Sequence, residues 1–398
     1  MRKVLISGAS VAGPALAYWL GHYGFEPTVV EIAPALRGGG RAVDFRGEAH
    51  LTVLRRMGLL DSLREIQTGG SPMTFVDERG RTLLHLPADF AGGEVEVLRS
   101  DLSRVLYEHS RERAKYVFGD SISRLVETPN GVEVTFASGT EDRFDLVIGA
   151  DGLHSQVRRL TFGEEDQFVS HLGYYAATWD LPNYLGLPPG SLGYNVPGRL
   201  ASIACDFRDA DRAGAFMIFK SPKLAYARHD LDRQRALITN AYEGVGWETP
   251  RLLASLRDAT ELYFDSISRV DIQPWSRGRI GLVGDAACGA TIGGMGTGTG
   301  IVAAYVLAGE LATAGNDHRM AFGRYEALVR DYARGCQVGG NRTGKFLAPA
   351  SRFGARMRNG MLSNRFLLNL MLKAGENVSS GIRLPDYTHP TTLAGRSG

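Results

Sequence analysis

The first thirty-one residues carry the pattern that most restricts what this chain can fold into. An apolar, β-branched run over residues 2–7 leads into the glycine turn "GASVAG", and an apolar helical pattern follows over residues 11–23. A second apolar run, "EPTVVE", ends at Glu31. A strand, a tight turn, a helix and a second strand in this order predict a β-α-β unit, and therefore an α/β fold.

The turn itself carries most of a dinucleotide-binding fingerprint. Gly8 and Gly13 occupy the first and last glycine positions of G-x-G-x-x-G, Ala12 precedes the last, and Ser10 stands in the middle position. The first glycine allows the tight turn, and the last lets the helix pack on the strand with its amino terminus toward a pyrophosphate. Glu31 ends the second strand, where a carboxylate accepts from a ribose hydroxyl and disfavours a 2′-phosphate. The motif predicts NAD or FAD and leaves both open.

The pattern changes twice along the 398 residues, a length that suits two closely packed domains. From about 165 to 270 the residues alternate in aromatic-rich runs, as in an antiparallel sheet, and a Rossmann-type strand returns at 278–287. We therefore predict a discontinuous cofactor-binding domain and an inserted sheet domain. The first comprises residues 1–70, 98–165 and 271–335, and the second comprises residues 71–97 and 166–270. A helical region, 336–375, and a tail, 376–398, follow.

Charge and composition exclude several classes of partner. The 45 basic and 43 acidic residues leave a net charge of +2, which gives no electrostatic reason to expect a nucleic acid or a membrane as a partner. No apolar run approaches the ~20 residues of a membrane span. A run of late arginines is predicted to be a solvated helix face: Arg352, Arg356, Arg358 and Arg365.

Cysteine and histidine patterns favour a cytoplasmic protein without a metal site. The three cysteines show no C-x-x-C pattern, and the amino terminus runs directly into the first strand, so we expect a reducing compartment and no signal peptide. The nine histidines form no metal-binding spacing.

Two later motifs choose between the cofactors. "GADGLHSQVR", residues 149–158, is an Asp-Gly turn after an apolar strand, and "GRIGLVGDAACGATIGGMGTGTG", residues 278–300, delivers Asp285 at a strand end. With these motifs the sequence resembles the group A flavoprotein monooxygenases, the para-hydroxybenzoate hydroxylase-like family, and is similar to its tetracycline-inactivating branch. The matching residues are Asp151, Gly152, Ser155, Val157 and Arg158, then Gly284, Asp285, Ala286, Ala287, Gly296 and Gly298.

The resemblance implies a Rossmann-like FAD-binding domain, a mostly antiparallel β-sheet substrate domain and carboxy-terminal helices. It also implies that NADH or NADPH reduces FAD and that O2 then forms a flavin C4a-hydroperoxide. That species would hydroxylate an aromatic or polycyclic small molecule or, as the peroxide anion, attack a ketone. We expect a monomer or a homodimer.

Several residues are expected at the flavin. Asp285 can accept from the ribityl hydroxyls, and the helix that follows Gly296, Thr297 and Gly298 would point its dipole at the pyrimidine end. Asp151 belongs to the Asp-Gly turn of the family. The resemblance assigns Arg99 to the flavin and its phosphates. It assigns Arg37 and Asp44 to the flavin and the nicotinamide cofactor, although a surface salt bridge explains these two residues equally well.

Other positions depart from the family or are weaker candidates. Cys288 stands where the family has His or Tyr, as either a thiol near the flavin or a small buried residue, and the loop after it lacks the usual proline. Arg46 is a candidate to project into the substrate pocket, and His154 is expected to be a solvent-exposed turn residue. The pocket is predicted on alternate residues of the sheet: Tyr174 and Thr178, or in the opposite register Tyr194, Met217 and Phe219.

Two other functions stay open from the sequence. One is an FAD-dependent reductase or dehydrogenase, and the other is a non-redox, cyclase-like protein that holds FAD structurally. The altered loop after Cys288 is the main support for the non-redox alternative.

Overall fold

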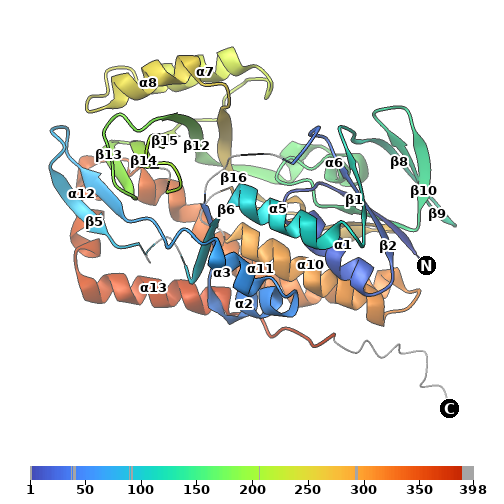
Figure 1. The fold of residues 1–398 in the computed structure, drawn as a ribbon. Helices are drawn as coiled ribbons and strands as arrows, with labels where there is room; N and C mark the ends of the chain where they lie inside the picture. Colours follow the sequence, from blue (N-terminus) through green and yellow to red (C-terminus); the bar gives the residue numbers. More distant parts are fainter. Residues whose placement is uncertain are drawn as a thin grey trace.

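The computed structural model describes most of the chain as two layered regions, each built on its own sheet (Figure 1). The described residues are 2–36, 38, 42–88, 90, 93–205, 207–291 and 295–387. Two long helices, α10 (Gly296–Thr313) and α11 (His318–Leu347), run beneath the sheets (Figure 1). Among the described residues, no helix combines the length and the apolar character that a membrane span needs.

The first sheet has six strands in the order β17-β18-β11-β1-β2-β7, and every neighbouring pair except β17–β18 is parallel. Helix α1 (Ala12–His22) packs against α10 and against α5 (Arg99–Ser110). Both α1 and α10 are apolar on nearly all sides, so both are buried. The predicted β-α-β unit is confirmed as β1-α1-β2. The strands are β1 (Lys3–Ser7), β2 (Glu26–Glu31), β7 (Lys115–Phe118), β11 (Leu146–Gly149), β17 (Ser276–Arg277) and β18 (Ile280–Leu282).

Smaller elements complete this region. A three-stranded antiparallel sheet shares a hydrophobic core with the first sheet, through residues such as Val132 and Val134. A two-stranded sheet, β3 (Ala42–Phe45) with β6 (Val95–Leu98), lies beside α2 (Gly47–Arg56) and α3 (Leu60–Glu65). The remaining elements are β8 (Ile122–Thr128), β9 (Gly131–Phe136), β10 (Glu141–Phe144), α6 (Gln156–Phe162), η1 (Glu165–Gln167) and α9 (Asp285–Cys288).

The second sheet has seven strands in the order β16-β12-β15-β14-β13-β4-β5, antiparallel except for the β13–β4 pair. Alternate residues of β12 enter two different cores: Tyr175 and Ala177 pack under α7 and α8, whereas Tyr174 and Ala176 pack toward α11, α12 and α13. Both faces are therefore covered (Figure 1). The strands are β4 (Met73–Val76), β5 (Thr82–Leu86), β12 (Val169–Pro182), β13 (Ser191–Val196), β14 (Arg199–Cys205), β15 (Arg212–Lys220) and β16 (Tyr263–Val270). The helices are α7 (Leu231–Ala241), α8 (Thr249–Asp258), α12 (Arg352–Leu362) and α13 (Arg365–Ser379).

Helix α11 belongs to both cores. Phe322 and Tyr325 are buried in the core of the first sheet, and Leu347, at the other end of the helix, is buried in the core beneath the second. One continuous helix therefore fixes the two sheets relative to each other.

The turn between β1 and α1 has no room for a side chain. A Cβ atom at Gly13 would lie 1.9 Å from the Gly8 carbonyl oxygen. Gly8 has a φ of +109°, and its own Cβ would lie 2.5 Å from the Ala150 carbonyl oxygen. The glycines therefore allow α1 to start directly against β1 and beside the end of β11.

We predict that Gly13→Ala lowers the free energy of unfolding by at least about 2 kcal/mol, because backbone must shift to admit the methyl group. Gly323→Ala is the matched control: Gly323 lies in α11, and a Cβ there would have no atom within 4 Å. It should raise the free energy of unfolding by roughly 0.5–1 kcal/mol. Denaturant unfolding measures both, and equal stabilities would contradict the prediction.

Candidate functional site

Three loops that are far apart in the sequence meet at the carboxyl edge of the first sheet. A Cβ at Gly284, after β18, would lie 2.9 Å from the Cβ of Ala12, and a Cβ at Gly300 in α10 would lie 3.5 Å from the same atom. In α/β folds this edge is where ligands bind. The glycine turn, the "GDAA" motif and the glycine-rich start of α10 therefore belong to one site.

Glu31 is held at this edge by the turn itself. Its two carboxylate oxygens accept hydrogen bonds from the Ala9 N–H at 2.8 Å and the Ala33 N–H at 3.0 Å. The Gly8 N–H donates to the Val30 carbonyl at 2.8 Å. A carboxylate has about four lone-pair sites, so Glu31 retains acceptor capacity toward a ligand hydroxyl.

Ser10, in the middle fingerprint position, has a charged partner. The Arg99 guanidinium, at the start of α5, donates to the Ser10 Oγ at 3.1 Å. Arg99 is exposed on the same side as Asp285: burial raises the pKa of the Asp285 carboxyl, and the charge of Arg99 opposes that rise. A Cβ at Gly296 would lie 3.0 Å from the Asp285 Oδ1, which places Asp285 beside the first turn of α10. Thr297 is partly exposed in that same turn.

Gly298 is packed against a buried histidine, which sequence reasoning missed. A Cβ at Gly298 would lie 2.2 Å from the His50 Cε1. The His50 Nδ1 accepts from the Arg46 N–H at 3.3 Å, and its Nε2 lies 2.6 Å from the Tyr332 hydroxyl. Burial lowers the pKa of His50 to about 4, so the ring is neutral near pH 7. No local sequence signal connects Gly298 to His50.

The candidate residues near β3 form an ion pair with each other. The Arg46 Nε lies 2.5 Å from the Asp44 Oδ2, and both side chains are mostly buried. Arg37, the other residue predicted in this segment, lies outside the described residues.

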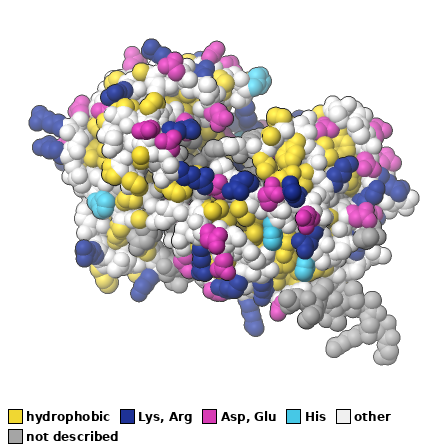
Figure 2. Space-filling model, in the orientation of Figure 1, with side chains coloured by type: hydrophobic (Ala, Val, Ile, Leu, Met, Phe, Trp, Pro, Cys, Tyr) yellow, Lys and Arg dark blue, Asp and Glu magenta, His cyan; other side chains and the backbone are white. Residues whose placement is uncertain are grey.

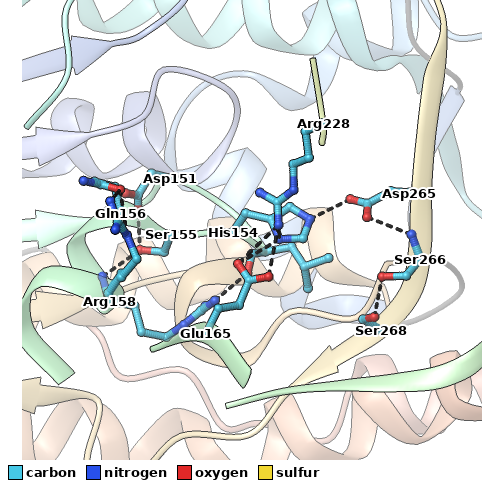
Figure 3. Close-up of polar contacts among 12 residues, drawn as sticks. Asp151, His154, Ser155, Gln156, Arg158, Glu165, Arg228, Asp265, Ser266 and Ser268 are labelled. Carbon is cyan, nitrogen blue, oxygen red and sulfur yellow. Dashed lines mark hydrogen bonds and ion pairs between the residues drawn. The ribbon is translucent and has the colours of Figure 1, made fainter. Parts of the chain in front are cut away.

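The Asp-Gly turn binds its own neighbours. The Asp151 carboxylate accepts from the Val157 N–H at 3.0 Å and from the Ser155 hydroxyl, and burial raises its pKa. The Arg158 side chain, 1% exposed, donates to the Ala286 carbonyl at 2.9 Å. Arg158 thereby ties the Asp-Gly turn to the "GDAA" motif (Figure 3 labels both Asp151 and Arg158).

The expectation that His154 is a solvent-exposed turn residue is wrong. Its side chain is only 20% exposed, and it lies between two carboxylates: Nδ1 is 2.9 Å from Glu165, and Nε2 is 2.8 Å from Asp265 on β16 (Figure 3). Arg228 pairs with Glu165 at 3.0 Å. The cluster joins the Asp-Gly turn to the edge strand of the second sheet. The partners lie 11 and 111 residues from His154, so spacing could not reveal them.

The pKa values of the cluster follow from these contacts. Burial alone would lower the pKa of His154, but its hydrogen bonds to Asp265 and Glu165 outweigh that effect and raise it. Burial likewise opposes the ionisation of Glu165, yet His154 and Arg228 lower its pKa to about 2. The two carboxylates therefore favour the charged form of His154, and the Arg228 guanidinium, which also contacts the His154 Nδ1, opposes it.

The two registers proposed for the pocket lie on opposite faces of the second sheet. Tyr194, Met217 and Phe219 pack into the core under α7 and α8. Tyr174 is buried on the other face, against the Ala348 carbonyl, and Thr178 alternates with it on that face.

Tyr263, which sequence reasoning did not single out, lies directly opposite Thr178 in the β12–β16 register. It is 45% exposed, and burial raises the pKa of its hydroxyl, with Asp265 and Asp285 adding to the rise and Arg99 opposing it. The influence of Arg99 and Asp285 on Tyr263 shows that this end of β16 faces the loops of the first region.

Cys288 lies in the short helix α9. Its thiol is buried, and its Sγ lies 3.6 Å from the Gly284 carbonyl oxygen. Burial raises the pKa of the thiol, so it stays protonated.

Comparisons with known proteins decide the family. Residues 1–189 match the model of an FAD binding domain. A flavin-dependent monooxygenase from an unknown prokaryotic organism is 37% identical over 97% of this chain and 99% of its own length. The chain belongs to the flavin-dependent monooxygenases. The crystal structure of tetracycline destructase Tet(55) is 35% identical, with a TM-score of 0.85 over 97% of this chain and 99% of Tet(55).

The fold is also shared with more distant flavoproteins. Klebsiella pneumoniae HpxO, complexed with FAD and uric acid, has a TM-score of 0.72 at 22% identity, over 94% of this chain and 96% of HpxO. The donor set of this flavin-dependent monooxygenase fits FAD. The glycines at 8 and 13 let α1 begin directly against β1, and the exposed Arg99 and the carboxylate of Glu31 lie at this turn.

We predict that the His154 cluster makes the stability of this monooxygenase depend on pH. Because the folded-state pKa of His154 is raised, its contribution is fully present below its unfolded pKa and is lost as pH rises through the folded value. The loss in unfolding free energy caused by His154→Gln should therefore be larger near about pH 6 than near about pH 9. His229→Gln, at an exposed position, is the control. Denaturant unfolding at both pH values tests this, and a pH-independent difference would contradict it.

Proposed function

Within this family, we propose that the chain uses NADH or NADPH and O2 to oxidise an uncharged aromatic or polycyclic small molecule with FAD. The observation that carries the proposal is the meeting of three loops around Ala12, Gly284 and Gly300 at the carboxyl edge of a parallel sheet. Such an edge presents helix amino termini and strand-end side chains, which are the groups that bind a dinucleotide.

The residues suggest how FAD would lie. Glu31 would accept from the adenosine ribose, and Ser10, Arg99 and the amino end of α1 would hold the pyrophosphate. Asp285 would accept from the ribityl hydroxyls, and the first turn of α10, with Gly296, Thr297 and Gly298, would present its amides to the pyrimidine end. Bound FAD supplies the redox chemistry, namely hydride acceptance from the nicotinamide cofactor and activation of O2.

The chain's own groups then supply charge and exclude water. Arg99 and the positive end of the α10 dipole would stabilise negative charge at the two ends of the cofactor. Cys288 stays a neutral thiol and adds no charge beside Asp285. For the nicotinamide cofactor we propose contacts from the Asp44 segment, where Asp44 is already paired with Arg46.

For the substrate we propose the face of the second sheet that carries Thr178 and Tyr263, since this face approaches Arg99 and Asp285. Met217 and Phe219 are packed under α7 and α8, on the opposite face. A polycyclic substrate is supported by the likeness to Tet(55), which is named a tetracycline destructase.

We predict that Arg99→Ala weakens FAD binding by roughly ten- to a hundredfold, because one charge-assisted hydrogen bond to a phosphate is lost. Arg104→Ala is the control: Arg104 lies on the same helix, is 58% exposed and pairs with Asp101. Titration of FAD fluorescence against each variant measures the dissociation constant. Equal constants for the two variants would remove Arg99 from the proposed site.

The reaction itself is tested with the FAD-loaded enzyme and a panel of aromatic and polycyclic compounds. We expect a compound that stimulates NADH or NADPH oxidation, consumes O2 and gains one oxygen atom by mass spectrometry. Label from ¹⁸O2 should appear in the product. Substrate turnover under anaerobic conditions with NAD(P)H would indicate a reductase instead, and turnover without either co-substrate would indicate a cyclase-like reaction.

A further inference from the structure

Helices α12 and α13, at the left and lower left of Figure 1, expose an unusual share of apolar side chains. Most of the large apolar side chains that are exposed in the described part of the chain lie on these two helices, and two phenylalanines, Phe353 and Phe366, are each 75% exposed. The set is Phe353, Met357, Met361, Phe366, Leu370, Met371 and Val378. Exposed apolar side chains that are gathered in this way mark an interaction surface.

The exposed apolar side chains are separate from the helix faces that pack onto the sheet. Phe353, Met357 and Met361 are spaced four residues apart, so they form one stripe along α12. Other residues attach the two helices to the core: Leu362 on α12 and Leu368 on α13 are both buried under the second sheet. The stripe is therefore additional to what the fold needs.

The same segment is strongly basic, although the whole chain is nearly neutral. No Asp or Glu occurs between Asp331 and Glu376, a stretch that contains eight Lys and Arg residues. Four cations of the two helices are exposed: Arg352, Arg356, Arg365 and Lys373. In contrast, acidic and basic side chains are interspersed over much of the face seen in Figure 2.

Arg358, the remaining cation of α12, has a structural role. It is 6% exposed and donates to the Phe346 carbonyl at 2.8 Å and to the Asn195 side chain at 2.9 Å. The expectation of a solvated face is therefore confirmed for Arg352, Arg356 and Arg365 and is wrong for Arg358.

From this combination we infer that the α12–α13 surface binds an anionic lipid bilayer, with both helices lying in the plane of the membrane. The two helices carry five cations and a single acid, Glu376, and exposed apolar side chains flanked by an excess of cations are the pattern of interfacial helices. α12 has 11 residues and α13 has 15, so both are too short to cross a bilayer. A two-fold contact with a second copy would bring the same cations together, so charge favours an anionic surface over a dimer.

The test is flotation of the full-length, FAD-loaded protein with vesicles of phosphatidylcholine alone and of phosphatidylcholine mixed with phosphatidylglycerol. We expect binding to the mixed vesicles that weakens as salt is raised, since exposed charges are screened. The double variant Phe353→Ser with Phe366→Ser should lose at least about tenfold in binding, and so should Arg352→Gln with Arg356→Gln. The control is Leu231→Ser, because Leu231 is 37% exposed on α7, which covers the opposite face of the second sheet.

Circular dichroism melts establish that each variant is folded before its binding is compared. The inference is overturned if the unaltered protein floats with neither kind of vesicle, or if the phenylalanine variant binds as well as Leu231→Ser. It is also overturned if light scattering shows a dimer that the phenylalanine variant abolishes while vesicle binding is absent. Because the readout is binding, failure here leaves the proposed reaction intact.

Discussion

The site depends on a close contact between three small residues that carry no functional group. Ala12, Gly284 and Gly300 bring three loops so close together that a methyl group at either glycine would contact the Ala12 side chain. The contact brings the amino end of α1, which follows Ser10, the partner of Arg99, next to the turn that carries Asp285. At Gly284, where an added Cβ would lie 2.9 Å from the Ala12 Cβ, the packing leaves no room for one more carbon atom. Small residues at this contact thus bring together the elements that carry the polar side chains of the site.

The second sheet is held to the first region by interactions of two kinds. Helix α11 contributes to both hydrophobic cores, which is a large and apolar connection that does not depend on pH. The His154 cluster is a polar connection, as is the ion pair between Asp101 on α5 and Arg208 beyond β14. These polar contacts join the first region to the second at the ends of their elements, whereas the shared helix joins their cores.

The sequence was sufficient for features that depend on neighbouring residues. The β1-α1-β2 unit could be predicted because the strand, the glycine turn and the helix are consecutive, and their patterns are local. Glu31 and Asp285 could be placed at a common edge because the carboxyl ends of parallel strands lie together. The face of the second sheet on which Tyr174 and Thr178 lie could not be predicted, because period-two alternation is the same for either face. The partners of His154 and the contact of Gly298 with His50 depend on tertiary packing that has no local signature.

Two histidines have opposite pKa shifts, because one is buried inside the first region and the other lies beside carboxylates at the boundary of the two regions. His50 is fully buried without a carboxylate partner, so it stays neutral and can accept a hydrogen bond from the Arg46 N–H. A proton on Nδ1 would remove this acceptor, so the hydrogen bond from Arg46 needs the Nδ1 atom unprotonated. His154 lies between two carboxylates, so its charged form is favoured. The positive potential at the start of α10 therefore comes from backbone amides and not from His50, which keeps that end of the site independent of the titration that acts at the boundary between the sheets.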